Sequence, residues 1–296
     1  MAIMKKNDVF IVGTLVNVKT DVRTSDGKNY ISGKISVKVV LNGVENIIDA
    51  SIFAYEKTKE GADSKMFKTY AGLESMLNKR VRVTGSLGEG AIVDQSTGDV
   101  RHFNQINARF INPAYTTDTE DKATFEYSGF VTKSLFERKD KEDNLLGYRI
   151  EVAQANWNDD NCIVVRFDVD KDDIRKAETI SAHYLPGATV EFQGVLTSVT
   201  TMETKTVEAD FGEPIVKVFP KTEKAYTIVS GNLPLDENDE NAYSEAFKRQ
   251  LVAAYKQADV ERVEKARNSA TTDSAPVNPA AAAMGAITRS ARASLI

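Results

Sequence analysis

Apolar and polar residues alternate along much of the chain, and this two-residue period predicts β-strands. Aliphatic residues from Ile31 to Val39 share one face of such a segment, and Tyr30, Lys34 and Lys38 share the other. A helical spacing of apolar residues interrupts the pattern once in the first half. The predicted elements are strands at 9–20, 30–41, 47–55, 81–87 and within 100–111, with a helix at 64–77 before the fourth strand.

The second half repeats this order of elements. Its predicted strands are 125–136, 145–157, 162–169, 190–196 and a fifth within either 215–219 or 225–231, with a helix ending at Tyr184 before the fourth strand. The fourth strands read VRVTGSL and VEFQGVL, with Gly85 and Gly194 at the same place. The first strands carry Gly13 and Gly129. Five elements matching in order predict that the chain contains one kind of domain twice.

Polar and charged segments divide the chain into four parts. We expect a first domain at 1–115, a second at 123–235 after the polar linker 116–122, a helix at 241–268 and a flexible tail at 269–296. The helix carries an apolar stripe of Tyr243, Phe247, Leu251 and Tyr255. The favoured interpretation is that this stripe packs back on a barrel. The alternative is that it docks on a replication protein or on another copy of the chain.

The composition indicates a soluble intracellular protein. Apolar residues make up 42% of the 296 residues, and no apolar run approaches the ~18 residues of a membrane span. The start of the chain lacks a signal-peptide pattern, and Cys162 is the only cysteine, so a reducing, cytoplasmic location is expected. Residues 1–115 carry a net charge of +4, residues 116–235 carry −8 and residues 236–296 carry −1. The first domain is therefore the better candidate for binding a polyanion.

A five-stranded unit with its helix between the third and fourth strands has the element order of the OB-fold. Two such units, with glycines in their first and fourth strands, resemble the tandem OB-fold single-stranded DNA-binding proteins of phages. The resemblance spans residues ~5–235 and implies two five-stranded Greek-key barrels in a mostly β chain. Many proteins of this class end in an acidic tip, whereas residues 288–296 are basic, so recruitment of partners through such a tip is not expected.

Binding a single strand requires cations for phosphates and aromatic faces for bases. In an OB barrel the usual platform is the outer face of the second and third strands with the adjoining loops. The candidate residues in the first domain are Tyr30, Lys34 and Lys38 on the second strand, Phe53 and Tyr55 on the third, Arg23 and Lys28 in the first loop, Arg80 and Arg82 on the fourth strand, and Arg101 and Phe103 near the fifth. The alternative is that the aromatic residues only cover the barrel end and the cations are merely solvated.

The second domain offers Trp157 and Arg166 as candidates, but its acidic balance favours weak DNA binding or a protein contact. Signals for catalysis, metals and cofactors are poor: the run of Asp168, Asp170 and Asp172 lacks the glycine of a calcium loop and favours a helix cap. We therefore expect a non-enzymatic, sequence-tolerant protein that binds single-stranded DNA, or RNA, in replication or recombination. The alternative is a structural or scaffold protein whose barrels bind other proteins.

Overall fold

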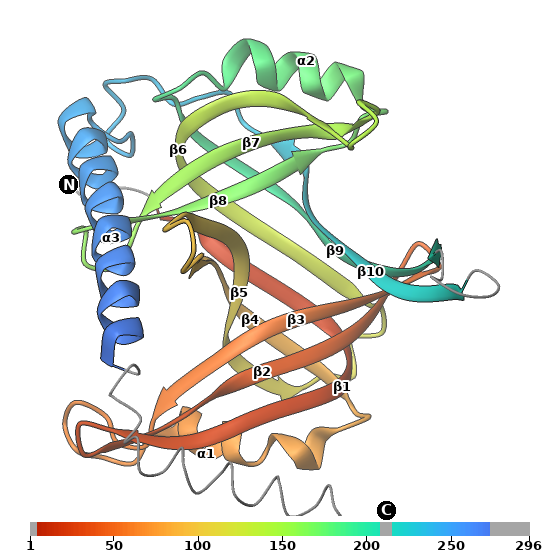
Figure 1. Ribbon diagram of the computed structural model, residues 1–296, viewed down its shortest axis with the longest axis vertical. Coiled ribbons are helices and arrows are strands. Elements are labelled where there is room, and N and C mark those ends of the chain that lie inside the picture. The colour runs from red at the N-terminus through yellow and green to blue at the C-terminus, as the bar shows by residue number, and fades with distance from the viewer. Residues whose placement is uncertain (1–4, 208–214, 273–296) are drawn as a thin grey trace, which may run out of the picture.

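The computed structural model describes residues 5–207 and 215–272, and the chain is mostly β with a long C-terminal helix (Figure 1). The first unit comprises β1 (Asn7–Ser25), β2 (Lys28–Leu41), β3 (Val44–Tyr55), α1 (Lys65–Ala71), a 3-10 helix (Leu73–Met76), β4 (Arg80–Val93) and β5 (Val100–Pro113). The second unit comprises β6 (Lys122–Lys139), β7 (Leu145–Ala155), β8 (Cys162–Val169), α2 (Ile174–His183), β9 (Thr189–Val207) and β10 (Ile215–Gly231). The final element is α3 (Glu245–Thr272).

The elements fall where the periodicity places them, but several differ in extent. The helix predicted at 64–77 is α1 followed by the 3-10 helix, and the fourth strands continue past the predicted 87 and 196, to Val93 and Val207. The two alternatives for the last strand are both right, because β10 is one long strand that pairs with β9 along its length. The C-terminal helix continues to Thr272, four residues into the predicted tail. The rest of that tail, residues 273–296 with the basic chain end, lies outside the described residues.

The five strands of the first unit close into a barrel. β1 pairs with β2 and β4, β2 pairs with β3, β4 pairs with β5, and a parallel bridge from Ser51 to Asn107 joins β3 to β5. The helix α1 covers one end of this barrel, because Tyr70 is 1% exposed and its hydroxyl donates to the Ala108 carbonyl at 3.0 Å. Ser64 caps the helix by accepting from the Phe67 amide, as its sequence position predicts.

The strands of the second unit pair in the corresponding way. β6 pairs with β7 and β9, β7 with β8, β9 with β10, and a parallel bridge from Asp168 to Thr227 joins β8 to β10. The register matches as well: Val9 lies opposite Gly85, and Phe125 lies opposite Gly194. The two halves of the chain thus share strand pairing as well as element order.

The matched glycines have the same physical cause in each unit. A Cβ on Gly13 would lie 2.3 Å from the Lys38 carbonyl oxygen, and one on Gly129 would lie 2.2 Å from the carbonyl oxygen of Ala153. Such distances exclude any side chain. At these places two strands approach so closely that only glycine fits. Gly85 meets a carbonyl oxygen in the same manner at 2.2 Å, and Gly194 does so at 2.1 Å.

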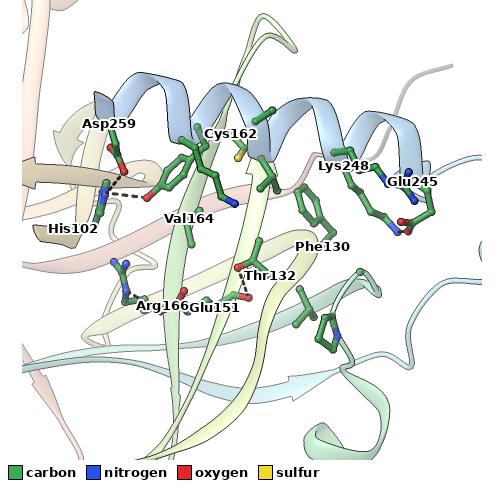
Figure 2. A pocket seen from close by; sticks show the side chains of 18 of the residues that line it. His102, Phe130, Thr132, Glu151, Cys162, Val164, Arg166, Glu245, Lys248 and Asp259 are labelled. Atoms are coloured by element: carbon green, nitrogen blue, oxygen red, sulfur yellow. Dashed lines mark hydrogen bonds and ion pairs between the residues drawn. The ribbon is translucent and has the colours of Figure 1, made fainter. Parts of the chain in front are cut away.

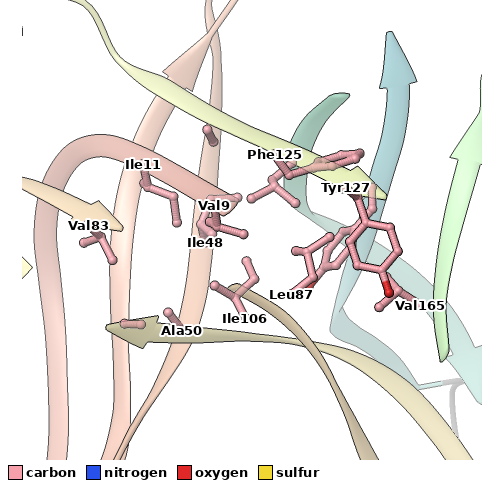
Figure 3. Close-up of a cluster of buried hydrophobic side chains, with 14 of the residues drawn as sticks. Val9, Ile11, Ile48, Ala50, Val83, Leu87, Ile106, Phe125, Tyr127 and Val165 are labelled. Atoms are coloured by element: carbon pink, nitrogen blue, oxygen red, sulfur yellow. The ribbon is translucent and has the colours of Figure 1, made fainter. Parts of the chain in front are cut away.

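One antiparallel pairing joins the two units edge to edge. β1 lies beside β6 with Val9 opposite Phe125, which are the two residues that face the fourth-strand glycines. Each unit therefore presents the same surface to the other, as in a symmetric dimer interface. The core continues across this pairing: Figure 3 shows Val9 and Leu87 beside Phe125 and Tyr127 in a single buried cluster.

Each unit also extends a hairpin over the other. Asn46 on β3 accepts a hydrogen bond from the Ser198 amide of β9 at 2.9 Å, and Lys224 of β10 reaches Asp49 of β3 at 2.9 Å. In the reverse direction, Asn104 on β5 exchanges two hydrogen bonds with the backbone of Arg166 on β8. Two seams result, one on each side of the β1–β6 pairing.

The helix α3 packs on the outer face of the second unit, which confirms the favoured interpretation of its apolar stripe. Tyr243 and Leu251 are 2% and 0% exposed and join a buried cluster with Phe130 and Cys162. Figure 2 shows Phe130 and Cys162 beside α3. Further along, Asp259 lies 2.9 Å from His102 of the first unit. The helix thus contacts both units (Figure 1). Within the described part of the chain, no helix is both long and apolar enough to cross a membrane.

The thiol of Cys162 reports on the position of α3. It is 5% exposed and donates to the Leu251 carbonyl at 3.6 Å, and burial raises the pKa of Cys162 to about 12. The reactive thiolate is therefore scarce at pH 8, whereas an exposed thiol with a pKa near ~8.5 forms it readily. We expect a disulfide reagent to label the native protein at pH 8 at least ~10-fold more slowly than the urea-unfolded protein. Equal rates would show that α3 does not cover the thiol in solution.

Candidate nucleic-acid interface

Three aromatic side chains form a cluster on the outer face of β2 and β3. The ring centroids of Tyr30 and Phe53 are 5.3 Å apart, those of Phe53 and Tyr55 are 5.0 Å apart, and those of Tyr30 and Tyr55 are 6.2 Å apart. Phe53 is 50% exposed and Tyr55 is 49% exposed, whereas their neighbour Ile52 is 3% exposed and points inward. The alternation of the strand thus aims the rings at solvent, as predicted, and we call them the aromatic cluster.

Cations lie on the same face. Residues directly opposite one another in an antiparallel pair point to the same side of the sheet. Arg23 on β1 lies opposite Tyr30, and Lys34 on β2 lies opposite Ser51 of β3. Arg23 pairs with Asp21 at 3.1 Å, and its side chain is 61% exposed. The predicted combination of rings and cations therefore occurs across β1, β2 and β3, and Lys28, exposed at the start of β2, lies beside it.

Lys19 belongs to this face and was missed by the sequence analysis. It lies opposite Lys34 and is exposed. A β-bulge between Leu15 and Asn17 shifts the alternation of β1, so counting from the start of the strand assigns the wrong face beyond it. The one sequence signal for this bulge was Asn17, a polar residue in an otherwise apolar run.

The two arginines of β4 lie elsewhere and are already engaged. Arg80 pairs with Asp121 at 2.5 Å and donates to the Asp118 carbonyl at 2.8 Å. These contacts hold the segment between β5 and β6 against β4. The guanidinium of Arg82 lies 4.7 Å from the ring centroid of Phe10, in a cation–π contact. Neither arginine side chain contacts the aromatic cluster.

Lys38 lies on β2, two residues beyond the buried Ser36, and pairs with Glu45 at 3.5 Å.

The β4–β5 hairpin borders the outer face of β2 and β3. Phe103 is 44% exposed and lies over Gly90, where a Cβ would approach the ring to 2.3 Å. With Lys34 and Ser51 it lines a cavity of about 310 Å³. The side chain of Arg101 is 78% exposed and is 3.8 Å from Asp94, so it remains available to a phosphate.

The corresponding face of the second unit is different. Ser51 and Asp168 are equivalent, because each forms the parallel bridge between the third and fifth strands of its unit. Two and four residues further on, the first unit has Phe53 and Tyr55, and the second has Asp170 and Asp172. The apolar part of this face is covered by α3 (Figure 2). Trp157 is 91% exposed in the β7–β8 turn. The second unit therefore has acidic residues at the two places where the first unit has Phe53 and Tyr55.

Arg166, a predicted binding residue, lies inside a seam. Its side chain is 21% exposed and contacts Glu151 at 3.3 Å and Glu89 at 3.8 Å. Glu89 in turn accepts a hydrogen bond from the Tyr255 hydroxyl at 2.6 Å and lies 3.0 Å from His102. These contacts link β8, the β4–β5 hairpin and α3, so Arg166 contributes to holding the units together.

Comparisons with known proteins agree with this architecture. The family model described as YorF matches residues 5–269. The chain belongs to the YorF family. No curated protein sequence matches it.

Solved structures give the fold of this YorF chain. The crystal structure of a deletion variant of the single-stranded DNA-binding protein from Thermus aquaticus matches with a TM-score of 0.50 at 15% identity, covering 80% of this chain and 98% of that one. The wild-type form of the same protein matches with a TM-score of 0.49 at 15% identity, covering 80% and 96%. The first likeness supports a mostly β fold with a closed five-stranded barrel, five further strands and a C-terminal helix.

Among the described residues, no group of three or more His, Cys, Asp or Glu side chains could hold a metal ion. Asp173, directly after the acidic run, caps α2 by accepting from the Lys176 amide at 3.1 Å, so the helix cap is confirmed at this end of the run. Asp168 has a different role, because it is 6% exposed and pairs with Arg138 and Arg149 at 2.8 Å. The arrangement is suited to binding through stacking and charge.

Proposed function

We propose that this protein binds single-stranded DNA without strong sequence preference and performs no enzymatic step. The observation that carries the proposal is the solvent-facing aromatic cluster with Lys19, Arg23 and Lys34 on the same face. Aromatic rings stack on any base, and cations follow the phosphates. A likeness in fold to a single-stranded DNA-binding protein supports the proposal without establishing it. The function would be protection of single strands during replication or recombination, in the bacterial cytoplasm if a phage encodes the protein.

We further infer that the chain is a tandem of two OB-fold domains, residues 1–115 and 123–235. The matched registers at Val9 and Phe125 and the matched third-to-fifth-strand bridges support a duplication. The shared core maintains the fold of both copies. The residues on the outer face of each copy can therefore change independently. In this account the first domain binds the strand and the second supports it.

Binding should depend on salt as expected for a polyanion ligand. Each phosphate contacted on a single strand contributes about −0.7 to the slope of log K against log salt. Contacts from Lys19, Arg23, Lys34 and Arg101 predict a slope of about −3. Fluorescence anisotropy of labelled oligo(dT) at several salt concentrations measures it. Changing Lys19 and Arg23 to glutamine should reduce the slope by about 1 to 1.5, whereas an unchanged slope would remove these residues from the interface.

A scaffold function is the second candidate, and one observation favours it. The face of the second unit already receives an amphipathic helix, because α3 buries Tyr243 and Leu251 against Phe130 and Cys162. A barrel face of this kind can bind a helix of another protein. Absence of binding to any oligonucleotide at low salt, with a folded protein, would favour this function over the first.

A further inference from the structure

A cavity lies at one of the two seams, next to the aromatic cluster. It has a volume of about 310 Å³ and lies between the β2–β3 face, the β4–β5 hairpin and the β9–β10 hairpin. This size is at the lower end of the ~300–1,000 Å³ typical of small-ligand pockets. Ser51 at its edge is two residues from Phe53 along β3, a step of roughly 7 Å on the same face. A strand that is stacked on the cluster and runs along β3 towards Ser51 would therefore reach the cavity.

The charged groups of the cavity favour an anionic neighbour. Lys34 and Lys224 both contact Asp49, at 2.7 Å and 2.9 Å. Burial alone would raise the pKa of Asp49, but hydrogen bonds from the two lysines and from Ser36 hold it below its usual value. Two ammonium groups around one carboxylate leave a net positive charge, and each ammonium keeps further donors for a phosphate.

A buried hydroxyl in the wall of this cavity lacks a partner. Ser198 lines the cavity, is 4% exposed, and its Oγ has no hydrogen-bond partner among the described residues. Buried polar side-chain atoms are normally satisfied, so an unsatisfied one calls for an explanation such as a ligand or an ordered water. The amide side chain of Gln105 and the Phe103 ring line the same space. The cavity thus combines an aromatic wall with hydrogen-bonding groups.

The other seam carries a different residue at the equivalent place. Counting from Gly85 and Gly194, which occupy the same place, Ser198 corresponds to Glu89. At the other seam the Glu89 carboxylate accepts a hydrogen bond from the Tyr255 hydroxyl at 2.6 Å and lies 3.0 Å from His102. The two seams therefore present different groups at this place: a carboxylate that already has partners, and a short hydroxyl without one.

We propose that this cavity receives one nucleobase of the bound single strand, with Ser198 and Gln105 hydrogen-bonding to the edge of the base and Phe103 contacting its face. Lys34 and Lys224 then hold the adjoining phosphate. This inference rests on the proposed function and adds a site of base discrimination to a surface that is otherwise tolerant of sequence. A base too large for the cavity, or one with unmatched hydrogen-bonding groups, binds there less well.

The test compares labelled oligo(dT), oligo(dC) and oligo(dA) of one length, bound to the wild-type protein and to Ser198→Ala and Ser198→Leu variants. Wild-type protein should distinguish the best from the worst homopolymer by roughly 3- to 10-fold, the range expected of one or two hydrogen bonds. Both variants should lose this difference. Ser198→Ala should unfold at the same or a higher urea concentration than wild type, because it removes only an unsatisfied hydroxyl.

The outcomes separate this inference from the proposed function. If wild-type protein binds no oligonucleotide, the proposed function fails and the cavity has no strand to receive. If it binds all three homopolymers equally, and the variants behave as wild type does, then DNA binding stands and the cavity holds water only. If the wild-type preference persists in both variants, the discrimination arises elsewhere and the cavity proposal is wrong.

Discussion

Replacing both Phe53 and Tyr55 by alanine is expected to weaken binding to oligo(dT) by at least ~30-fold. Each base stacked on an aromatic ring contributes roughly 1–3 kcal/mol, so two lost rings remove at least about 2 kcal/mol. Both side chains are about half exposed, and their loss leaves the buried neighbours Ile52 and Ala54 in place. The urea midpoint should therefore change little, and anisotropy titration together with urea unfolding measures both effects.

An exposed aromatic away from the cluster provides a matched control. Phe110 is 58% exposed on β5. Phe110→Ala should leave oligo(dT) affinity within ~2-fold of wild type. If this control reduces affinity as much as the double variant does, binding follows exposed aromatic surface in general and the assigned face is wrong.

Leu251→Ala should destabilise the protein by about 2–5 kcal/mol, the usual cost of removing a fully buried leucine side chain. Leu251 is 0% exposed, in a cluster with Phe130 and Cys162, and it packs the N-terminal part of α3 against the second unit. The helix should then open more often, and Cys162 should react with a disulfide reagent faster than in wild type. Urea unfolding and the labelling rate at pH 8 measure the two effects.

Val260→Ala is the control on the same helix, because Val260 is 51% exposed. Its unfolding free energy should stay within about 0.5 kcal/mol of wild type, with labelling of Cys162 unchanged. Faster labelling in both variants would mean that the helix opens for reasons unrelated to the buried stripe. Wild-type stability in Leu251→Ala would contradict the packing of α3 on the second unit.

The sequence predicted the local elements and the orientation of the aromatic cluster, because both depend on the alternation of neighbouring residues. Phe53 and Tyr55 come directly after Ile52 and Ala54, which face inward, so both point outward. No distant contact changes this alternation. Lys19 was missed because a bulge, which depends on the pairing partner, reverses the phase within β1. The repeated glycines were found because close backbone approach excludes every other residue.

The contacts between the units could not be predicted from local pattern. Arg166 has the outward phase of a ligand-binding cation, yet the β4–β5 hairpin of the other unit brings Glu89 to within 3.8 Å of it. Arg80 likewise has the phase of an exposed cation but pairs with Asp121, which is 41 residues away. Both outcomes depend on how the units pair across β1 and β6, which no spacing within one strand encodes.

Titration of fluorescently labelled oligo(dT) with the wild-type protein at low salt, beside a duplex of the same length, tests the central claim most directly. The account predicts saturable binding to the single strand, with the duplex bound at least ~10-fold more weakly because its bases are not free to stack on the cluster. Equal affinity for both forms would show that charge alone attracts DNA. No binding to the single strand, by a protein shown to be folded, would contradict the account and leave the scaffold function as the better explanation.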